Sequence, residues 1–151
     1  MMRIPGMIML ACLALPAAGR AQSVQQQITP LMDEMMVAAN AHDTDRFLAT
    51  YLHDSSLVLV FNGVVTNGFD NVRALQLKWW NNGKSDVAYA QRGSSEFTVL
   101  SPDAAVVTNI MTSRRTLPSG EASAGEFAVT MVWQKQAGGW RIVQVHESTV
   151  H

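Results

Sequence analysis

Cysteine is nearly absent from this chain of 151 residues, in which Cys12 is the only thiol. One thiol cannot build an internal disulfide framework, and Cys12 lies in an N-terminal segment that we expect the mature protein to lose. The mature protein is therefore expected to have neither a thiolate nucleophile nor a thiolate metal site.

The sequence also lacks an excess of charge of one sign. Its formal net charge is −1, and no stretch gathers Lys and Arg on one face. Binding to nucleic-acid phosphates depends on such a basic surface, so we expect no nucleic-acid partner.

Histidines with the spacing of metal ligands are missing as well. The four histidines, His42, His53, His146 and His151, form no H-x-H or H-x-x-x-H pair. Such pairs place two imidazoles on one face of a strand or helix, where both can reach one ion. We therefore expect no metal site and no cofactor, and we interpret His42 and His53 as surface or capping residues.

The N-terminus has the anatomy of a secretory signal peptide over residues 1–21. Arg3 supplies the positive charge, residues 7–15 form an apolar run too short to span a bilayer, and a small-x-small cleavage site precedes Gln22. An alternative is lipid attachment at Cys12. The preferred interpretation predicts a periplasmic or secreted protein without stable membrane insertion after cleavage.

Residues 22–151 have the composition of one globular domain, because 48% of the whole chain is hydrophobic and only 15% is charged. Apolar residues recur every three or four positions over 25–40, which predicts an amphipathic helix. Asp43 is the expected N-cap of a second helix that buries Tyr51 among its apolar residues, and a third helix is expected over 69–83.

Strand patterns occupy the rest of the chain. Two short β-branched runs flank Asn62-Gly63, which predicts a hairpin with a type I′ turn. After residue 84 come four longer strand-like runs separated by turns, and Gly93 within the first predicts a bulge. Helices grouped before an antiparallel meander predict an α+β fold in which the helices cover one side of a curved sheet.

This order of elements, the helix "HDTDRFLATYLHDS", the "NG" hairpin and the ending "VWQKQAGGWRIVQVHES" resemble the SnoaL-like or DUF4440 branch of the nuclear transport factor 2 (NTF2)-like superfamily. The resemblance implies a cone in which three N-terminal helices close a strongly curved sheet around a pocket. Ketosteroid isomerase, polyketide cyclases and the association domain of calcium/calmodulin-dependent protein kinase II share this fold, so the fold does not define the function.

The closing strand carries His146 and Glu147 side by side. Because side chains alternate along a strand, these two are expected on opposite faces. A single alternation would place Trp140, Ile142, His146 and Ser148 together on the outer face. By resemblance to the kinase association domain, Glu147 points into the cone and is the candidate catalytic carboxylate, while His146 and Ser148 have structural roles.

Candidate ligand-binding residues follow from the same alternation and resemblance. Asn109 and Met111 share a face of their strand, as does Met131 with its neighbours. The resemblance places Met111 and Met131 where the association domain has pocket arginines, which favours an apolar guest over an anion. It also places Trp80 near that domain's pocket tryptophan, with Trp79 as the alternative, and Tyr51 completes the set.

Two functions remain open from the sequence. The first is non-catalytic binding of a small, largely apolar molecule. The second is acid–base catalysis of the ketosteroid isomerase or polyketide cyclase kind, in which a pocket carboxylate has its pKa raised by desolvation. Glu147 is the main candidate, and Glu96 and Glu126 are alternatives.

The outer face of the sheet is expected to be apolar. Val106, Ile110, Val132 and Ile142 would lie together on it. An exposed apolar patch of this kind indicates a protein–protein contact, so we expect a homodimer.

Overall fold

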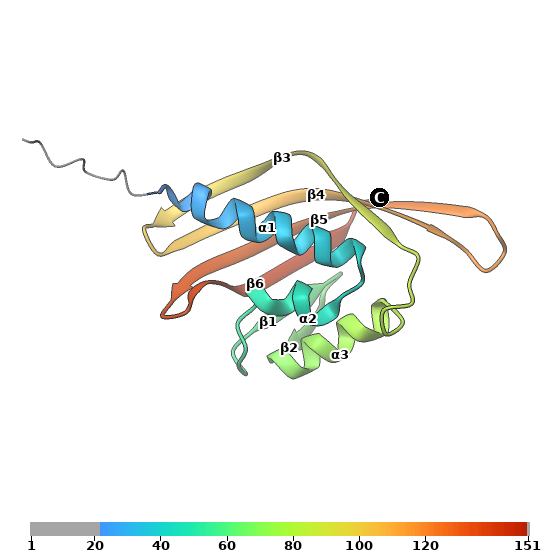
Figure 1. Ribbon diagram of the computed structural model, residues 1–151, viewed down its shortest axis with the longest axis horizontal. Helices are drawn as coiled ribbons and strands as arrows, with labels where there is room; N and C mark the ends of the chain where they lie inside the picture. The colour runs from blue at the N-terminus through green and yellow to red at the C-terminus, as the bar shows by residue number, and fades with distance from the viewer. Residues whose placement is uncertain (1–21, 151) are drawn as a thin grey trace, which may run out of the picture.

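Helices gather on one side of a six-stranded sheet in the computed structural model, which describes residues 22–150 (Figure 1). The helical segments are α1 (Val24–Asn40), α2 (Thr44–Phe47), η1 (Leu48–Thr50) and α3 (Phe69–Trp79). The strands are β1 (Val58–Phe61), β2 (Val64–Asn67), β3 (Ala88–Ser101), β4 (Ala104–Thr116), β5 (Ala122–Gln136) and β6 (Gly139–Thr149). The predicted signal peptide, with Cys12, lies outside the described residues.

The strands follow the order β2-β1-β6-β5-β4-β3 across the sheet. Only β1 and β6 run parallel, and every other neighbouring pair is antiparallel. The long strands bend around the helices, so that the sheet is strongly curved but not closed (Figure 1). The predicted α+β cone with a mixed sheet is confirmed.

Side-chain caps start the first two helices, and the sequence predicts the second of them, at Asp43. The Ser23 hydroxyl accepts a hydrogen bond from the Gln26 amide at 3.2 Å, and the Gln26 side chain accepts one from the Ser23 amide at 2.9 Å. Asp43 accepts a hydrogen bond from the Arg46 amide at 3.1 Å at the start of α2. Each bond satisfies an amide that the first helical turn would leave unpaired.

The β1–β2 hairpin has the predicted turn. Asn62 and Gly63 both adopt positive φ, 47° and 83°, as a type I′ turn requires. The Asn62 side-chain oxygen also accepts a hydrogen bond from the Thr149 amide at 2.9 Å. The turn is thereby joined to the end of β6, the strand that carries Glu147.

The predicted bulge in β3 is present. Gly93 has a φ of 74°, and the pairing with β4 changes register between Arg92 and Glu96. A bulge increases the local bend of a strand. β3 runs beside α1 (Figure 1), and the Asn40 side chain of α1 forms hydrogen bonds with the Tyr89 backbone.

A second bulge, in β6, contradicts the single alternation expected for this strand. Ile142 pairs with Trp133 and Gln144 pairs with Val132, so that Val143 is an extra residue. Ile142 is therefore fully buried instead of lying on the outer face. The extra residue reverses the alternation, which leaves Glu147 on the same face as Ile142.

The core fills the space between the helices and the concave face of the sheet. Its fully buried side chains include Ile28 of α1, Leu57, and Trp133 and Val145 of the central strands. Within residues 22–150, no helix has both the length and the apolar character needed to cross a bilayer.

Candidate binding and acid–base site

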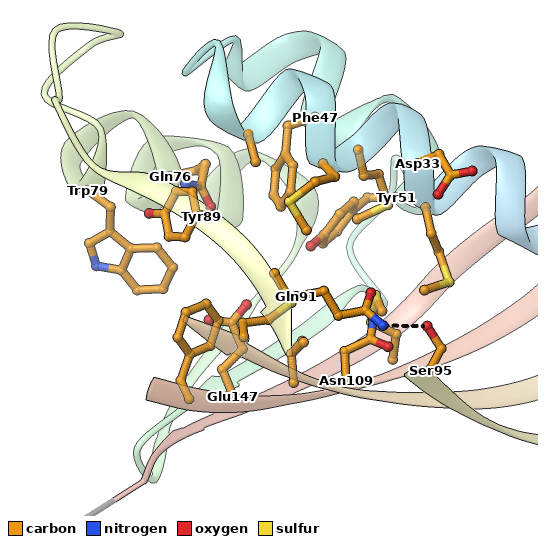
Figure 2. Close-up of a pocket in the computed structure, with 18 of the residues that line it drawn as sticks. Asp33, Phe47, Tyr51, Gln76, Trp79, Tyr89, Gln91, Ser95, Asn109 and Glu147 are labelled. Atoms are coloured by element: carbon orange, nitrogen blue, oxygen red, sulfur yellow. Dashed lines mark hydrogen bonds between the residues drawn. The ribbon is translucent and has the colours of Figure 1, made fainter. Parts of the chain in front are cut away.

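A cavity of about 350 Å³ remains between the helices and the concave face of the sheet, beside this core. Residues from α1, α3 and the four long strands line it, and Figure 2 shows their side chains converging on one space. Cavities of this size accommodate small organic ligands. The expected cone pocket is therefore present.

Six aromatic side chains form much of the wall, namely Phe47, Tyr51, Trp79, Trp80, Tyr89 and Phe127. Neighbouring rings contact one another: the Phe47 and Trp80 centroids are 5.1 Å apart, and those of Tyr89 and Phe127 are 6.2 Å apart. Edge-to-face contacts of this kind hold the rings in defined orientations. The aromatic wall is therefore already formed without a ligand.

Trp79 and Trp80, which the sequence offered as alternatives, both line the cavity. Trp80 is only 2% exposed and donates a hydrogen bond from its indole nitrogen to the Tyr89 hydroxyl oxygen at 3.0 Å. Trp79 is 36% exposed and packs against Phe61, with ring centroids 5.1 Å apart. Trp80 thus belongs to the inner wall, and Trp79 is a partly exposed part of the lining.

Glu147 lies on β6 and points into the cavity, as the resemblance predicts (Figure 2). Its neighbours on the adjoining strands are the apolar residues Phe61 and Val129. The carboxyl group makes no hydrogen bond or ion pair with another residue of 22–150. It is therefore a carboxyl group in an apolar wall, without a polar partner from the described chain.

Burial raises the pKa of the Glu147 carboxyl from 4.5 to about 7, because the ionised form loses hydration that nothing in the cavity replaces. Near neutral pH the ionised and protonated forms are both populated. Glu147 can consequently accept a proton, donate one or pair with a cation under ordinary conditions.

Two tyrosine hydroxyls share the field of this carboxyl group. Burial raises the pKa of Tyr51, and the Glu147 charge raises it further. Burial also raises the pKa of Tyr89, although the hydrogen bond from Trp80 acts in the opposite direction. Both phenols therefore stay protonated at neutral pH and can act as hydrogen-bond donors.

Asn109 lies two strands from Glu147 in the same cross-strand row. The row runs from Asn109 on β4 through Val129 on β5 to Glu147 on β6. The Asn109 side-chain oxygen is buried and has no hydrogen-bond partner within residues 22–150. Such an unpaired group is costly in an interior and marks a place where a guest can supply the missing donor.

The predicted methionines also line the cavity. Met111 and Met131 are 6% and 4% exposed, and Met32, Met35 and Met36 of α1 face them across the same space. Unbranched thioethers adapt to irregular shapes, so this wall can adjust to different guests. Among residues 22–150, no lysine, arginine or histidine lines the cavity.

The other candidate residues on the strands lie outside the cavity. His146 and Ser148 are exposed on the opposite face of β6, and their structural roles stay predictions. Neither Glu96 nor Glu126 lines the cavity, and Glu126 forms an ion pair with Arg92 at 3.1 Å.

The two helix-flanking histidines each contact a backbone carbonyl oxygen. His42 contacts the Val87 carbonyl oxygen at 2.7 Å, and His53 contacts that of Leu48 at 3.1 Å. Within the described part of the chain, no group of three or more His, Cys, Asp or Glu side chains is placed to hold a metal ion.

Several lining residues were not identified from the sequence. Tyr89 and Gln91 come from the start of β3, which shows no apolar alternation in the sequence. Gln76 is a buried polar residue on an otherwise ordinary helix. Asp33, from α1, lies at the exposed rim (Figure 2). Phe127 alone had a signal, because it alternates with Val129 and Met131 on β5.

A curved mixed sheet, a helical cover and an enclosed cavity define an NTF2-like α+β cone. The sequence matches the SnoaL-like domain model over residues 28–151, so the chain belongs to the SnoaL-like domain family. The DUF4440 branch of the expectation stays a prediction.

Solved structures share this fold. An NTF2-like protein of unknown function from Shewanella oneidensis is 26% identical, with 82% of this chain and 98% of that one covered and a TM-score of 0.69. The association domain of Caenorhabditis elegans CaMKII is 23% identical, with 83% and 95% covered and a TM-score of 0.67. A ketosteroid isomerase-like protein from Erwinia carotovora is 21% identical, with 83% and 95% covered and a TM-score of 0.66. No curated protein matches the sequence.

Proposed function

We propose that this SnoaL-like protein is exported and binds a small, largely apolar molecule in its cone cavity. The observation that carries the proposal is a preformed cavity of about 350 Å³ with a wall of aromatic and methionine side chains. Ligand pockets typically combine such an apolar wall with a few polar groups that orient the guest. Glu147, Asn109 and the two tyrosine hydroxyls are those groups here.

The polar groups also indicate how a guest would lie. The Asn109 oxygen needs a donor, whereas Tyr51 and Tyr89 offer hydroxyl protons. Because Asn109 and Glu147 are two strands apart, their backbones are separated by roughly 10 Å, twice the spacing of neighbouring strands. A guest of one or two rings spans this distance with its apolar body against Val129 and the aromatic wall.

Filling the cavity tests the binding function. A neutral apolar dye, N-phenylnaphthylamine, is expected to gain fluorescence on binding the wild-type protein. Met131→Trp adds bulk inside the cavity and should weaken this binding at least about tenfold, whereas Val132→Trp adds the same bulk on the other face of β5 and should not. Equal affinity in both variants would place the dye elsewhere and contradict the proposal.

Mass spectrometry of the purified mature protein complements this test. A molecule that co-purifies with the wild type and is lost from Met131→Trp would identify the guest. Its retention in Met131→Trp would show that it is held outside the cavity.

Acid–base catalysis is the second candidate, and one observation favours it. Glu147 has a pKa of about 7 in an apolar site, next to two phenol donors. One structural relative is a ketosteroid isomerase-like protein. A carboxylate of this kind can remove a proton from the carbon next to a ketone while a phenol donates a hydrogen bond to the ketone oxygen.

Hydrogen exchange measures this activity without knowledge of the natural substrate. Cyclic ketones incubated in deuterated water should exchange the hydrogens next to the carbonyl faster with wild-type protein than with Glu147→Gln. The rate should rise with pH and level off above about pH 7, as Glu147 becomes ionised. No difference between wild type and variant would leave binding as the function.

A further inference from the structure

The charged side chains from residues 22–150 that line the cavity are all acidic. Glu147 lies inside and Asp33 lies at the exposed rim, and no cationic side chain from residues 22–150 lines the space. Anionic guests would meet two carboxyl groups and no counter-charge. Carboxylates and phosphates are therefore disfavoured, and the choice lies between neutral and cationic guests.

The surroundings of Glu147 favour a cationic guest over a neutral one. The Glu147 carboxylate has lost water on burial and has neither a hydrogen-bond donor nor an ion-pair partner among residues 22–150. A neutral guest leaves this loss in place or leaves the carboxyl group protonated. An ammonium group replaces the lost water with a charge-assisted hydrogen bond and an ion pair.

The aromatic wall supports the same guest. Tyr51, Tyr89 and Phe127 line the cavity with Glu147, and the rings of Tyr89 and Phe127 meet at 83°. A cation over the face of an aromatic ring within about 6 Å is attracted by the π electrons. Rings and a carboxylate around one space are the combination that binds an organic ammonium ion, whereas either one alone is compatible with ordinary core packing.

We infer that the cavity takes a lipophilic amine, bound as its monocation, with the ammonium group on Glu147 and the apolar body against the aromatic and methionine wall. This deepens the proposed function and rests on it. Asp33 at the rim attracts the cation to the opening. The buried oxygen of Asn109 accepts a second donor from the guest where one is present.

Binding of the cation is coupled to loss of the Glu147 proton. The titratable groups that line the cavity together with Glu147 are Tyr51, which follows η1, Tyr89 on β3 and, at the rim, Asp33 on α1. The residues of α3, β4 and β5 that line the cavity, and Phe61 of β1 that pairs with Glu147, have uncharged side chains. Arg115 on β4 is exposed, does not line the cavity and acts weakly on Tyr89. The amine therefore releases a proton on binding near neutral pH, and its affinity rises from about pH 5 to about pH 8.

Three probes with one ring system and different head groups test the inference. Tryptamine is cationic, tryptophol is neutral and indoleacetate is anionic, and calorimetry measures the affinity of each. We expect tryptamine to bind at least about tenfold more tightly than tryptophol, and indoleacetate to bind least. Calorimetry in buffers of different ionisation enthalpy should show proton release with tryptamine alone.

Glu147→Gln keeps the shape of the side chain and removes its charge. It should abolish the preference for tryptamine over tryptophol and the pH dependence of tryptamine binding. Glu121→Gln makes the same change on an exposed turn outside the cavity and should keep the preference. The Glu121 variant controls for net charge.

The outcomes separate the inference from the function on which it rests. Two results would overturn the inference of an amine guest on Glu147 and leave a neutral guest. The first is tryptophol binding as tightly as tryptamine, and the second is a preference for tryptamine that persists in Glu147→Gln. Binding of neither these probes nor N-phenylnaphthylamine would overturn the binding function itself.

Discussion

At the scale of single residues, Glu147 is a carboxyl group placed where its charge is unfavourable. A core position of this kind ordinarily carries an apolar residue, and its neighbours Phe61 and Val129 follow that rule. Because its pKa is raised from 4.5 to about 7, this group lowers the stability of the folded protein as the pH rises through that range. This cost is consistent with a group that serves binding or catalysis and not folding.

The first prediction concerns the pH dependence of stability. The folded pKa of Glu147, about 7, lies above the ordinary value of 4.5, so the folded state holds this proton more tightly than the unfolded state. The free energy of unfolding should therefore fall as pH rises from about 4.5 to about 7 and be unaffected by this group above that range.

Glu147→Gln resembles the protonated form and should lack this fall. At about pH 8 it should be more stable than the wild type by up to about 3 kcal/mol, and at about pH 4 the two should agree. Urea unfolding across this pH range measures the difference. Parallel curves for the two proteins would show that Glu147 is hydrated in the folded state.

The sequence predicted the main site residues but missed several others that line the cavity. Asn109, Met111 and Met131 line the cavity as predicted, because the alternation along β4 and β5 is regular. Glu147 also lines it, but its place was predicted by the resemblance, since the β6 bulge breaks the alternation of its own strand. Tyr89 precedes the β3 bulge and was missed because the start of this strand shows no apolar alternation that would mark its inner face. Local pattern thus predicts residues on strands with a clear alternation and loses them where that pattern is weak.

At the scale of elements, the β1–β2 hairpin holds the Glu147 end of the sheet. β1 runs parallel to β6 and pairs Phe61 with Glu147, and the Asn62 turn accepts a hydrogen bond from Thr149. A short hairpin is weak by itself, so its turn and its pairing with β6 depend on each other.

The second prediction tests this turn. Gly63 has a φ of 83° and open space around the position of an added Cβ, so Gly63→Ala introduces backbone strain without a clash. We expect a loss of about 1 kcal/mol in the free energy of unfolding. Gly138→Ala, outside the positive-φ region, is the control and should change stability less. Thermal and urea unfolding compare the two, and equal effects would rule out strain at Gly63 as the cause.

At the scale of the whole molecule, the helices cover one face of the sheet and leave the other open (Figure 1). Val106, Ile110 and Val132 lie half-buried on that open face, whereas Ile142 has moved to the core through the β6 bulge. The expected apolar patch is thus smaller than predicted, and the homodimer remains a proposal.

The third prediction concerns this pairing. Ile110→Lys places a charge at the centre of the outer face and should shift a dimer towards monomer, because an unpaired charge is costly in an apolar interface. Val64→Lys adds the same charge to the exposed β2 strand, at a residue 67% exposed, and should leave the mass unchanged. Light scattering after size exclusion reports the mass. A monomeric wild type would refute this dimer.

The fourth prediction concerns export. Protein recovered from its native compartment should begin at Gln22 and contain no titratable thiol, since Cys12 would leave with the signal peptide. N-terminal sequencing and thiol titration measure both. A chain that begins at Met1 would contradict the predicted periplasmic or secreted location, and a lipid on Cys12 would favour the alternative.

The sequence by itself determined the elements and their caps, because helical periodicity, the Asp43 cap and the Asn62-Gly63 turn depend on residues close together in the chain. It also determined the family, through patterns that extend over residues 28–151. Only the tertiary structure decided that Glu147 has no polar partner within residues 22–150 and that Tyr51, Tyr89 and Asn109 surround the same cavity. Desolvation and pairing depend on which distant segments meet, and a single extra residue in β6 reverses which side chains face inward.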